Sequence, residues 1–163
     1  MLKEKFDSLL SAALRAALDH YGERLITFAV FGSVGRGTQR ADSDVDILLV
    51  CDPLPLGRMR RITEFREVED QLEPMLASLE KEGITTSLSA ILKTPTEVKR
   101  GGLFYLDFVE DARLLYDRED FFRRYLEQLQ DRLRKLGARR IWQGNAWYWD
   151  LKPDFKPGDV LEI

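Results

Sequence analysis

Hydrophobic positions recur along this chain at two periods, one typical of helices and the other of strands. Apolar side chains three or four residues apart predict amphipathic helices over residues 2–21, 57–82 and 118–136. Shorter apolar or alternating runs, bounded by turn residues, predict strands over residues 24–31, 45–51 and 84–93. This mixture of long helices and short strands indicates a chain of the α/β class.

Glycine and proline residues mark where these elements should begin, end or bend. Gly22 is expected to stop the first helix. Pro74 should bend or split the long helix, because proline removes a helical hydrogen bond and clashes with the preceding turn. Thr94 followed by Pro95 predicts the start of a capped helical turn. A short helix and a short strand that ends near Tyr116 should follow it.

The periodic pattern disappears after Gly137, where the chain also becomes rich in aromatic residues. Residues 138–163 hold all three tryptophans, Trp142, Trp147 and Trp149. We expect an irregular tail that packs on the domain of residues 1–137 or lies at an interface, including that of a homodimer. The alternative is that the aromatic rings stack a base or contact RNA.

Charge and composition narrow the function classes. The chain of 163 residues has a net charge of −3 and a pI of about 5.3, which argues against non-specific nucleic-acid binding. The cluster Arg58–Arg61 is expected to lie mostly on a solvated helix face. No apolar run approaches the roughly 20 residues of a membrane helix, so no membrane association is expected. One cysteine and one histidine exclude a Cys/His zinc site, and the cytoplasm is the expected location.

The segment Phe31–Asp46, FGSVGRGTQRADSDVD, joins the first two predicted strands and carries the candidate chemistry. Its glycine-rich turn offers backbone N–H groups to an anion, and Ser33 can donate a hydroxyl to a phosphate oxygen. Arg36 can supply positive charge to a phosphate or hold the loop. Alternate residues of a strand project to the same face, so Asp44 and Asp46 can share one divalent metal. Phosphate and metal together indicate a nucleoside triphosphate (NTP).

Two better-known phosphate loops do not fit this segment. Gly32 and Gly37 have the spacing of a P-loop, but Thr38 stands where that loop needs its lysine. A dinucleotide fingerprint built on Gly35 and Gly37 would need a glycine at position 40, which is Arg40. Without the lysine, a bound metal must neutralise more of the phosphate charge.

The order Gly32-Ser33, two residues, Arg36-Gly37, five residues, Ser43-Asp44-Val45-Asp46 resembles the signature of the polymerase-β-like nucleotidyltransferase superfamily. It is most similar to the small prokaryotic members called minimal nucleotidyltransferases. The resemblance implies an α/β (α+β) nucleotidyltransferase fold, in which a short mixed sheet carries helices packed on one face. In this chain, a C-terminal helix and the tryptophan-rich tail would add to that core.

The same resemblance implies an activity and the residues that serve it. The activity is transfer of a nucleoside monophosphate from an NTP, which we expect to be ATP, to a hydroxyl acceptor with release of pyrophosphate. Asp44 and Asp46 would be catalytic and bind two Mg²⁺ ions, or Mn²⁺ in their place. The phosphates would be bound by Gly32, Ser33, Arg36 and Gly37. Some small relatives are antitoxins that modify a HEPN-domain toxin, so a HEPN-type protein is one expected partner.

One departure from the family pattern concerns a third carboxylate, which commonly lies on the next core strand. In this chain that strand has only the hydroxyl residues Thr86, Ser87 and Ser89 in the expected neighbourhood. Asp107 or Glu110, farther along the chain, could replace the carboxylate in space. The alternative function is therefore a catalytically weak or inactive module of the same fold that binds nucleotides or proteins.

Overall fold

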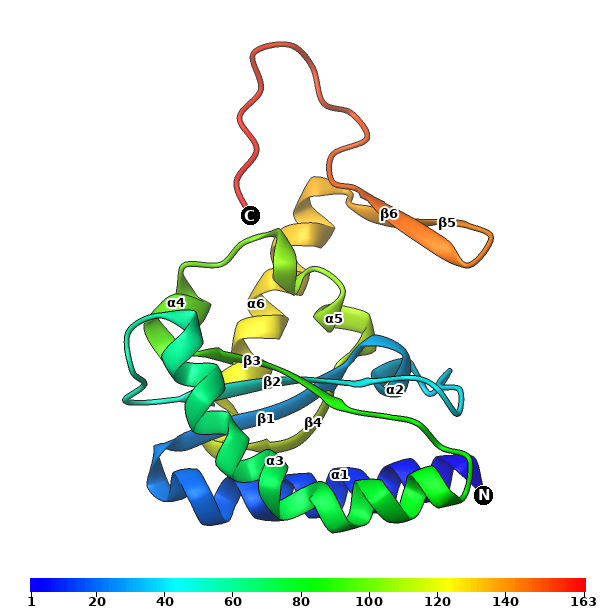
Figure 1. Cartoon of the computed structure of the whole chain (residues 1–163). Coiled ribbons are helices and arrows are strands. Elements are labelled where there is room, and N and C mark those ends of the chain that lie inside the picture. Colours follow the sequence, from blue (N-terminus) through cyan, green and yellow to red (C-terminus); the bar gives the residue numbers. More distant parts are fainter.

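A four-stranded mixed sheet lies at the centre of the fold (Figure 1). The computed structural model describes residues 1–163. The strands follow the order β3-β2-β1-β4, with β1 antiparallel to both β2 and β4, and β2 parallel to β3. Their bounds are β1 Leu25–Phe31, β2 Val45–Cys51, β3 Leu88–Lys93 and β4 Arg113–Asp117. The predicted mixed sheet of an α/β fold is thus confirmed.

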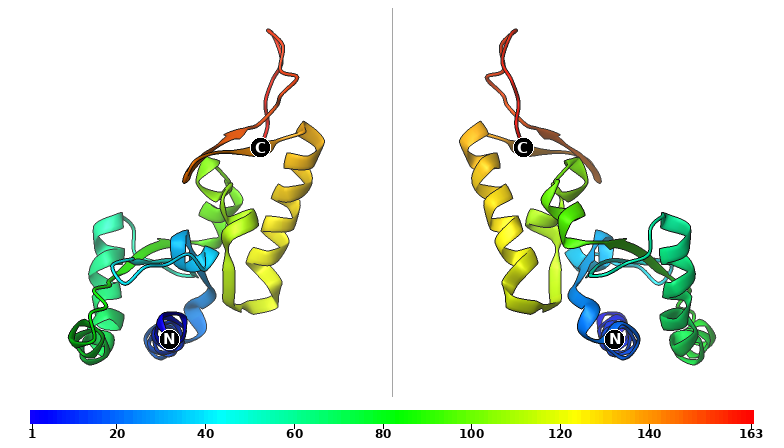
Figure 2. Two further views of the ribbon diagram at one scale, coloured as in Figure 1. Left: turned by 90° about the vertical axis from the view of Figure 1, so that its right-hand side faces the viewer. Right: turned by 90° about the vertical axis from the view of Figure 1, so that its left-hand side faces the viewer.

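Helices cover both faces of this sheet. The long helices α1 (Leu2–Tyr21) and α3 (Arg58–Lys81) pack on one face (Figures 1 and 2). The other face is covered by α4 (Pro95–Lys99), α5 (Phe108–Asp111) and α6 (Phe121–Leu136). The prediction of helices on one face is therefore right for α1 and α3 but wrong for the sheet as a whole.

The hydrophobic core is accordingly divided into two layers by β1 and β2. In β2, Ile47 and Leu49 face the layer of α1 and α3, while Leu48 and Val50 face the layer of α6. All four side chains are fully buried. A strand buried on both faces consists of a continuous apolar run rather than an alternating one, and β2 has that composition.

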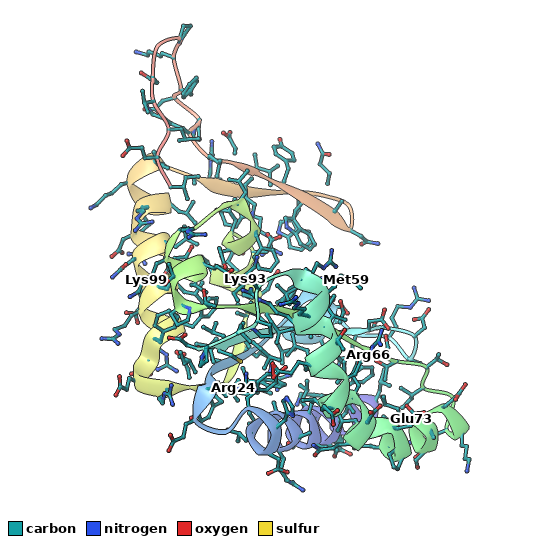
Figure 3. The ribbon with its side chains drawn as sticks, turned by 60° about the vertical axis from the view of Figure 1, so that its left-hand side comes forward. Arg24, Met59, Arg66, Glu73, Lys93 and Lys99 are labelled. Atoms are coloured by element: carbon teal, nitrogen blue, oxygen red, sulfur yellow. The ribbon has the colours of Figure 1, made fainter.

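Helix α3 bends and provides the long connection that two parallel strands require. It contains Pro74, and Figure 1 shows the helix as two segments that meet at the expected bend. Figure 3 shows Met59, Arg66 and Glu73 along the helix, with Lys93 at the end of β3. Arg61, in the same first turn as Met59, is buried, so the prediction of a solvated arginine cluster is wrong at this residue.

The start of α4 has the predicted cap. The Thr94 hydroxyl accepts a hydrogen bond from the Glu97 N–H at 3.3 Å, and the Glu97 carboxylate accepts one from the Thr94 N–H at 2.8 Å. Glu97 is therefore fixed at the N-terminal end of α4, where it also meets Arg61 of α3.

The C-terminal tail is more regular than its sequence suggested. Strands β5 (Arg139–Gln143) and β6 (Ala146–Asp150) form an antiparallel hairpin. This hairpin is separate from the four-stranded sheet and projects from the end of α6 (Figure 1). Gly144 and Asn145 make its two-residue loop. The prediction of an irregular tail is wrong for this segment, but residues 151–163 contain no helix or strand.

Candidate active site

The glycine-rich turn forms α2 (Gly32–Arg36) at the end of β1. Gly32 has a φ of +65°, and a Cβ built on it would lie 2.2 Å from Oδ2 of Asp46. Only glycine fits a backbone position that is both left-handed and this close to a carboxylate. The expected phosphate turn and the expected metal carboxylate are thus in direct contact.

Asp44 and Asp46 flank Val45 at the start of β2, as strand alternation requires. Asp44 is exposed, and its Oδ1 accepts hydrogen bonds from the Ser87 N–H at 3.2 Å and the Ser87 hydroxyl at 2.9 Å. Asp46 is half-buried and lies opposite Ser89 of β3 in the parallel register.

The pKa of Asp46 is affected by the nearby carboxylate of Asp44. Burial raises the pKa of Asp46, and the negative charge of Asp44 raises this pKa further. The guanidinium of Arg36 and a hydrogen bond from Ser89 lower the Asp46 pKa and partly offset both causes. A cation between the two aspartates would relieve their repulsion.

The donor set of this site suits a hard divalent metal with few protein ligands. No third aspartate, glutamate, histidine or cysteine joins Asp44 and Asp46 in a cluster. Ser89 occupies the position opposite Asp46 where the family pattern leads us to expect the third carboxylate. Mg²⁺ prefers oxygen ligands and retains several waters, so two carboxylates with substrate phosphates suffice to bind it. The residues present therefore fit Mg²⁺ or Mn²⁺.

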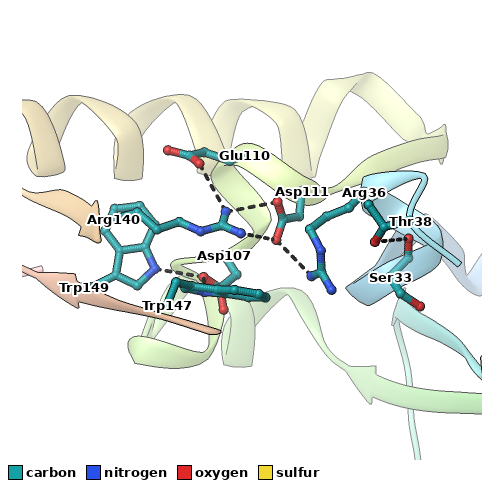
Figure 4. Close-up of polar contacts among 9 residues, drawn as sticks. All are labelled: Ser33, Arg36, Thr38, Asp107, Glu110, Asp111, Arg140, Trp147 and Trp149. Carbon is teal, nitrogen blue, oxygen red and sulfur yellow. Dashed lines mark hydrogen bonds and ion pairs between the residues drawn. The ribbon is translucent and has the colours of Figure 1, made fainter. Parts of the chain in front are cut away.

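Asp107 and Glu110 do not replace the missing carboxylate. Oδ1 of Asp107 accepts hydrogen bonds from the indole nitrogens of Trp147 at 2.7 Å and Trp149 at 2.8 Å. Glu110 forms an ion pair with Arg140 at 3.1 Å. Asp107, the N-cap residue of α5, and Glu110, within α5, are thus both directed to the C-terminal hairpin (Figure 4).

The remaining residues of the turn lie on α2 or at its end. The Ser33 hydroxyl makes no capping bond, although the Ser33 carbonyl accepts from the Thr38 N–H at 2.8 Å. Gly37 ends α2 in a left-handed conformation and is exposed. The structure therefore gathers Gly32, Ser33, Arg36 and Gly37 at the end of the sheet where Asp46 lies.

Arg36 points from α2 toward α5 rather than into solvent (Figure 4). Its Nη1 lies 3.4 Å from Oδ2 of Asp111, and its guanidinium lies 4.7 Å from the centre of the Trp147 indole ring. Asp111 also receives two hydrogen bonds from Arg140. Asp111, Arg140 and the link between them could not be predicted from the sequence, because no local pattern connects them to Arg36.

Comparison with known proteins supports a single family. The family described as Nucleotidyltransferase domain matches residues 11–116. A relative from Methanocaldococcus jannaschii, named as a protein adenylyltransferase, is 26% identical over 90% of this chain and 96% of its own length. The protein adenylyltransferase MntA of Thermococcus cleftensis is 37% identical over 45% of this chain and 67% of its own length.

Two solved structures show weaker similarity. A toxin–antitoxin crystal structure with AMP-PNP aligns over 78% of this chain and 92% of the matched chain, at 16% identity and a TM-score of 0.45. A complex of a tri-AMPylated Shewanella oneidensis HEPN toxin with MNT antitoxin aligns over 80% of this chain and 92% of the matched chain, at 12% identity and a TM-score of 0.41.

No helix of the chain combines the length and apolar character needed to cross a membrane. The family match covers more than half of the chain, including both aspartates and the whole glycine turn, and the chain therefore belongs to the nucleotidyltransferase family and is a nucleotidyltransferase.

Proposed function

We propose that this chain is a metal-dependent, cytoplasmic enzyme that transfers AMP from ATP to a hydroxyl group of a partner protein. The observation that carries the proposal is the direct contact between the Gly32 turn and the Asp46 carboxylate, with Asp44 beside it. This contact supports the proposal, because a phosphate loop and a metal-binding pair would have to meet at one point. The names of the two relatives support a protein as the acceptor and ATP as the donor.

In the proposed reaction, the acceptor oxygen bonds to the α-phosphorus, the bond from that phosphorus to pyrophosphate breaks, and the hydroxyl proton is released. Asp44 and Asp46 would hold Mg²⁺, which supplies neutralisation of phosphate charge and a lower pKa for the attacking hydroxyl. Ser33 and the backbone of α2 would orient the triphosphate, and Arg36 would contribute positive charge to it.

The absence of a third carboxylate bears on the acceptor. Ser89 opposite Asp46 has no useful basicity, so the chain offers little help in removing the acceptor proton. A tyrosine, whose pKa is about 10, ionises far more readily than a serine or threonine hydroxyl. Among protein hydroxyls, tyrosine is therefore the acceptor that suits this site best.

A HEPN-domain protein is the partner that the resemblance to minimal nucleotidyltransferases suggests, and the chain would act as its antitoxin. A second candidate function is a nucleotide-binding module that does not turn over, and the missing third carboxylate favours it. A homodimer stays a prediction, which analytical ultracentrifugation of the purified chain would check.

The decisive experiment incubates the chain with Mg²⁺, α-labelled ATP and a HEPN-domain protein from the same genome, and follows labelling of that protein. We expect a mass increase by one or more AMP groups and a loss of transfer when the metal is chelated. Asp46→Asn should lower the rate at least a hundredfold, because it removes a metal ligand without changing the shape of the side chain. Parallel reactions with GTP, CTP and UTP would identify the preferred base.

Asp42→Asn is the matched control, because Asp42 lies on the same loop but is highly exposed and pairs only with Arg40. Its transfer rate should equal that of the wild-type chain. If the wild-type chain bound ATP tightly and yet neither labelled the partner nor released pyrophosphate, the nucleotide-binding module would be the better description.

A further inference from the structure

The hairpin of β5 and β6 presents one face to α5. Cross-strand partners in an antiparallel pair project to the same side, and the pairs here are Arg140 with Trp149 and Trp142 with Trp147. These four residues therefore share one face of the hairpin. Tyr148 projects to the opposite face and is exposed.

This tryptophan-rich face holds α5 at several points. The indole nitrogens of Trp147 and Trp149 both donate to Asp107, at 2.7 and 2.8 Å. Arg140 donates through both terminal nitrogens to the two carboxylate oxygens of Asp111, at 3.0 and 3.1 Å. The Arg140 side chain is 3% exposed and that of Asp111 7%, so this bidentate pair is largely shielded from solvent.

Helix α5 in turn contacts the nucleotide loop. A Cβ on Gly35 of α2 would lie 2.7 Å from the Asp111 carbonyl oxygen, so the two backbones are packed as closely as glycine allows. Arg36, the next residue, reaches the Asp111 carboxylate at 3.4 Å and stacks its guanidinium on Trp147. A continuous set of contacts thus runs from the hairpin through α5 to α2 (Figure 4).

The geometry around Arg36 leaves its hydrogen-bonding capacity largely unused. Arg140 already binds both oxygens of Asp111, and the distance of 3.4 Å from Arg36 to the same carboxylate is that of a weak hydrogen bond. The Trp147 ring attracts the Arg36 guanidinium through its face, which takes up none of the N–H groups. Those donors lie in the guanidinium plane and suit bidentate binding of phosphate.

We infer that the β5–β6 hairpin positions the nucleotide loop, and that Trp147 is a positioning residue that holds Arg36 ready for the triphosphate. The inference rests on the proposed function and adds a specific role for the C-terminal segment. Trp147 does not touch the reacting atoms, and its effect on the reaction passes through Arg36 and α2.

The test compares Trp147→Leu with Tyr148→Leu, which removes the neighbouring aromatic ring from the outward face. Hydrogen exchange of the peptide that spans α2 is measured without nucleotide, and the affinity for a non-hydrolysable ATP analogue with Mg²⁺ is measured by calorimetry. In Trp147→Leu we expect faster exchange of α2 and about tenfold weaker nucleotide binding, while Tyr148→Leu behaves as wild type. Trp147→Phe, which keeps an aromatic face for Arg36, should recover most of the affinity.

The double variant Arg36→Ala/Trp147→Leu distinguishes positioning of Arg36 by Trp147 from a loss of structure that does not involve Arg36. If Trp147 acts largely through Arg36, the loss of nucleotide affinity in the double variant is smaller than the sum of the losses in the two single variants. Fully additive losses would overturn this role, as would unchanged α2 exchange in a Trp147→Leu variant that melts like the wild-type chain. A wild-type chain that bound no ATP analogue would instead overturn the proposed function, whatever the exchange of α2.

Discussion

Two arginine–carboxylate clusters lie at different places in this fold, and they differ in how completely the guanidinium is bonded. In the first, Arg61 of α3 meets Glu97 of α4 with both terminal nitrogens, at 2.8 and 3.0 Å. Arg61 Nε donates to the Pro55 carbonyl at 2.8 Å, and Nη1 also donates to the Leu92 carbonyl at 3.2 Å. Every nitrogen of this guanidinium therefore has a partner.

In the second cluster, Arg36 and Arg140 share the carboxylate of Asp111, and Glu110 also pairs with Arg140 at 3.1 Å. Asp111 is bound bidentately by Arg140, and Arg36 reaches it only at 3.4 Å. The Nε of Arg140 is buried and has no hydrogen-bond partner in the protein. N–H donors of Arg36 are thus left over in this cluster, on the side of the molecule where Asp46 lies.

The difference separates a structural contact from a contact that can serve a ligand. A saturated guanidinium has nothing to offer an incoming phosphate, and removing it leaves a partly buried carboxylate unpaired. An unsaturated guanidinium contributes less to the fold but can bind an anion with little rearrangement. We therefore expect the Arg61 cluster to support stability and the Arg36 cluster to support nucleotide binding.

The largest expected effect is on stability. Arg61→Met should lower the free energy of unfolding by about 3 kcal/mol, because it leaves Glu97 without its partner, whereas Arg36→Met should cost less than about 1 kcal/mol. Urea denaturation of both variants would measure the two values. Similar losses in the two variants would remove the distinction between the clusters.

A smaller effect is expected from acid. Hydrogen bonds from Arg61 lower the pKa of Glu97 from its usual 4.5 to about 2. The unfolded chain therefore takes up a proton first as the pH falls, so this contribution is complete above pH 4.5 and disappears toward pH 2. Allowing for the partial exposure of Glu97, it amounts to about 2 kcal/mol.

Glu97→Gln should accordingly make the free energy of unfolding less dependent on pH across this window. Urea denaturation at several acidic pH values would measure the slope. Glu80→Gln is the matched control, because Glu80 is an exposed glutamate of α3 whose side chain forms no hydrogen bond or ion pair, and it should keep the wild-type slope. A Glu97→Gln slope as steep as that of the wild type would show that other carboxylates dominate.

Most of the fold follows from local patterns. The predictions for α1 and β2 agree with the structure to the residue, because helical spacing and a Gly-rich or proline-rich boundary define each element. Strand β3 begins later than expected. The Thr85 N–H donates to the Ala41 carbonyl, and the Val45 N–H donates to the Ser87 carbonyl. Residues 85 and 87 therefore bond to the segment Phe31–Asp46 instead of extending the strand.

Where the predictions failed, tertiary contacts or an overlooked turn explain the result. The continuous apolar run of β2 already indicated burial on both faces, and α6 provides the second cover. The Gly144-Asn145 pair between alternating residues is a hairpin signal that the tryptophans obscured. The placement of Asp44 and Asp46 needs only strand alternation, whereas Arg36 and Asp111 are 75 positions apart and no sequence period links them.

The smallest expected effect is a shift in the pKa of Asp46 when Arg36 of the second cluster is removed. Arg36 lowers the Asp46 pKa, which burial and Asp44 raise, so Arg36→Ala should raise this pKa further. In the proposed mechanism Asp46 must be ionised to bind metal, and the acid limb of kcat/KM should therefore move to higher pH.

Two control variants should leave this limb in place. Arg40→Ala removes an exposed arginine on the same loop, and Glu97→Gln changes the first cluster. The measurement is kcat/KM for ATP against pH with a saturating acceptor. Identical acid limbs in Arg36→Ala and wild type would mean that Arg36 is directed at Asp111 and Trp147 alone, and would then make the second cluster as structural as the first.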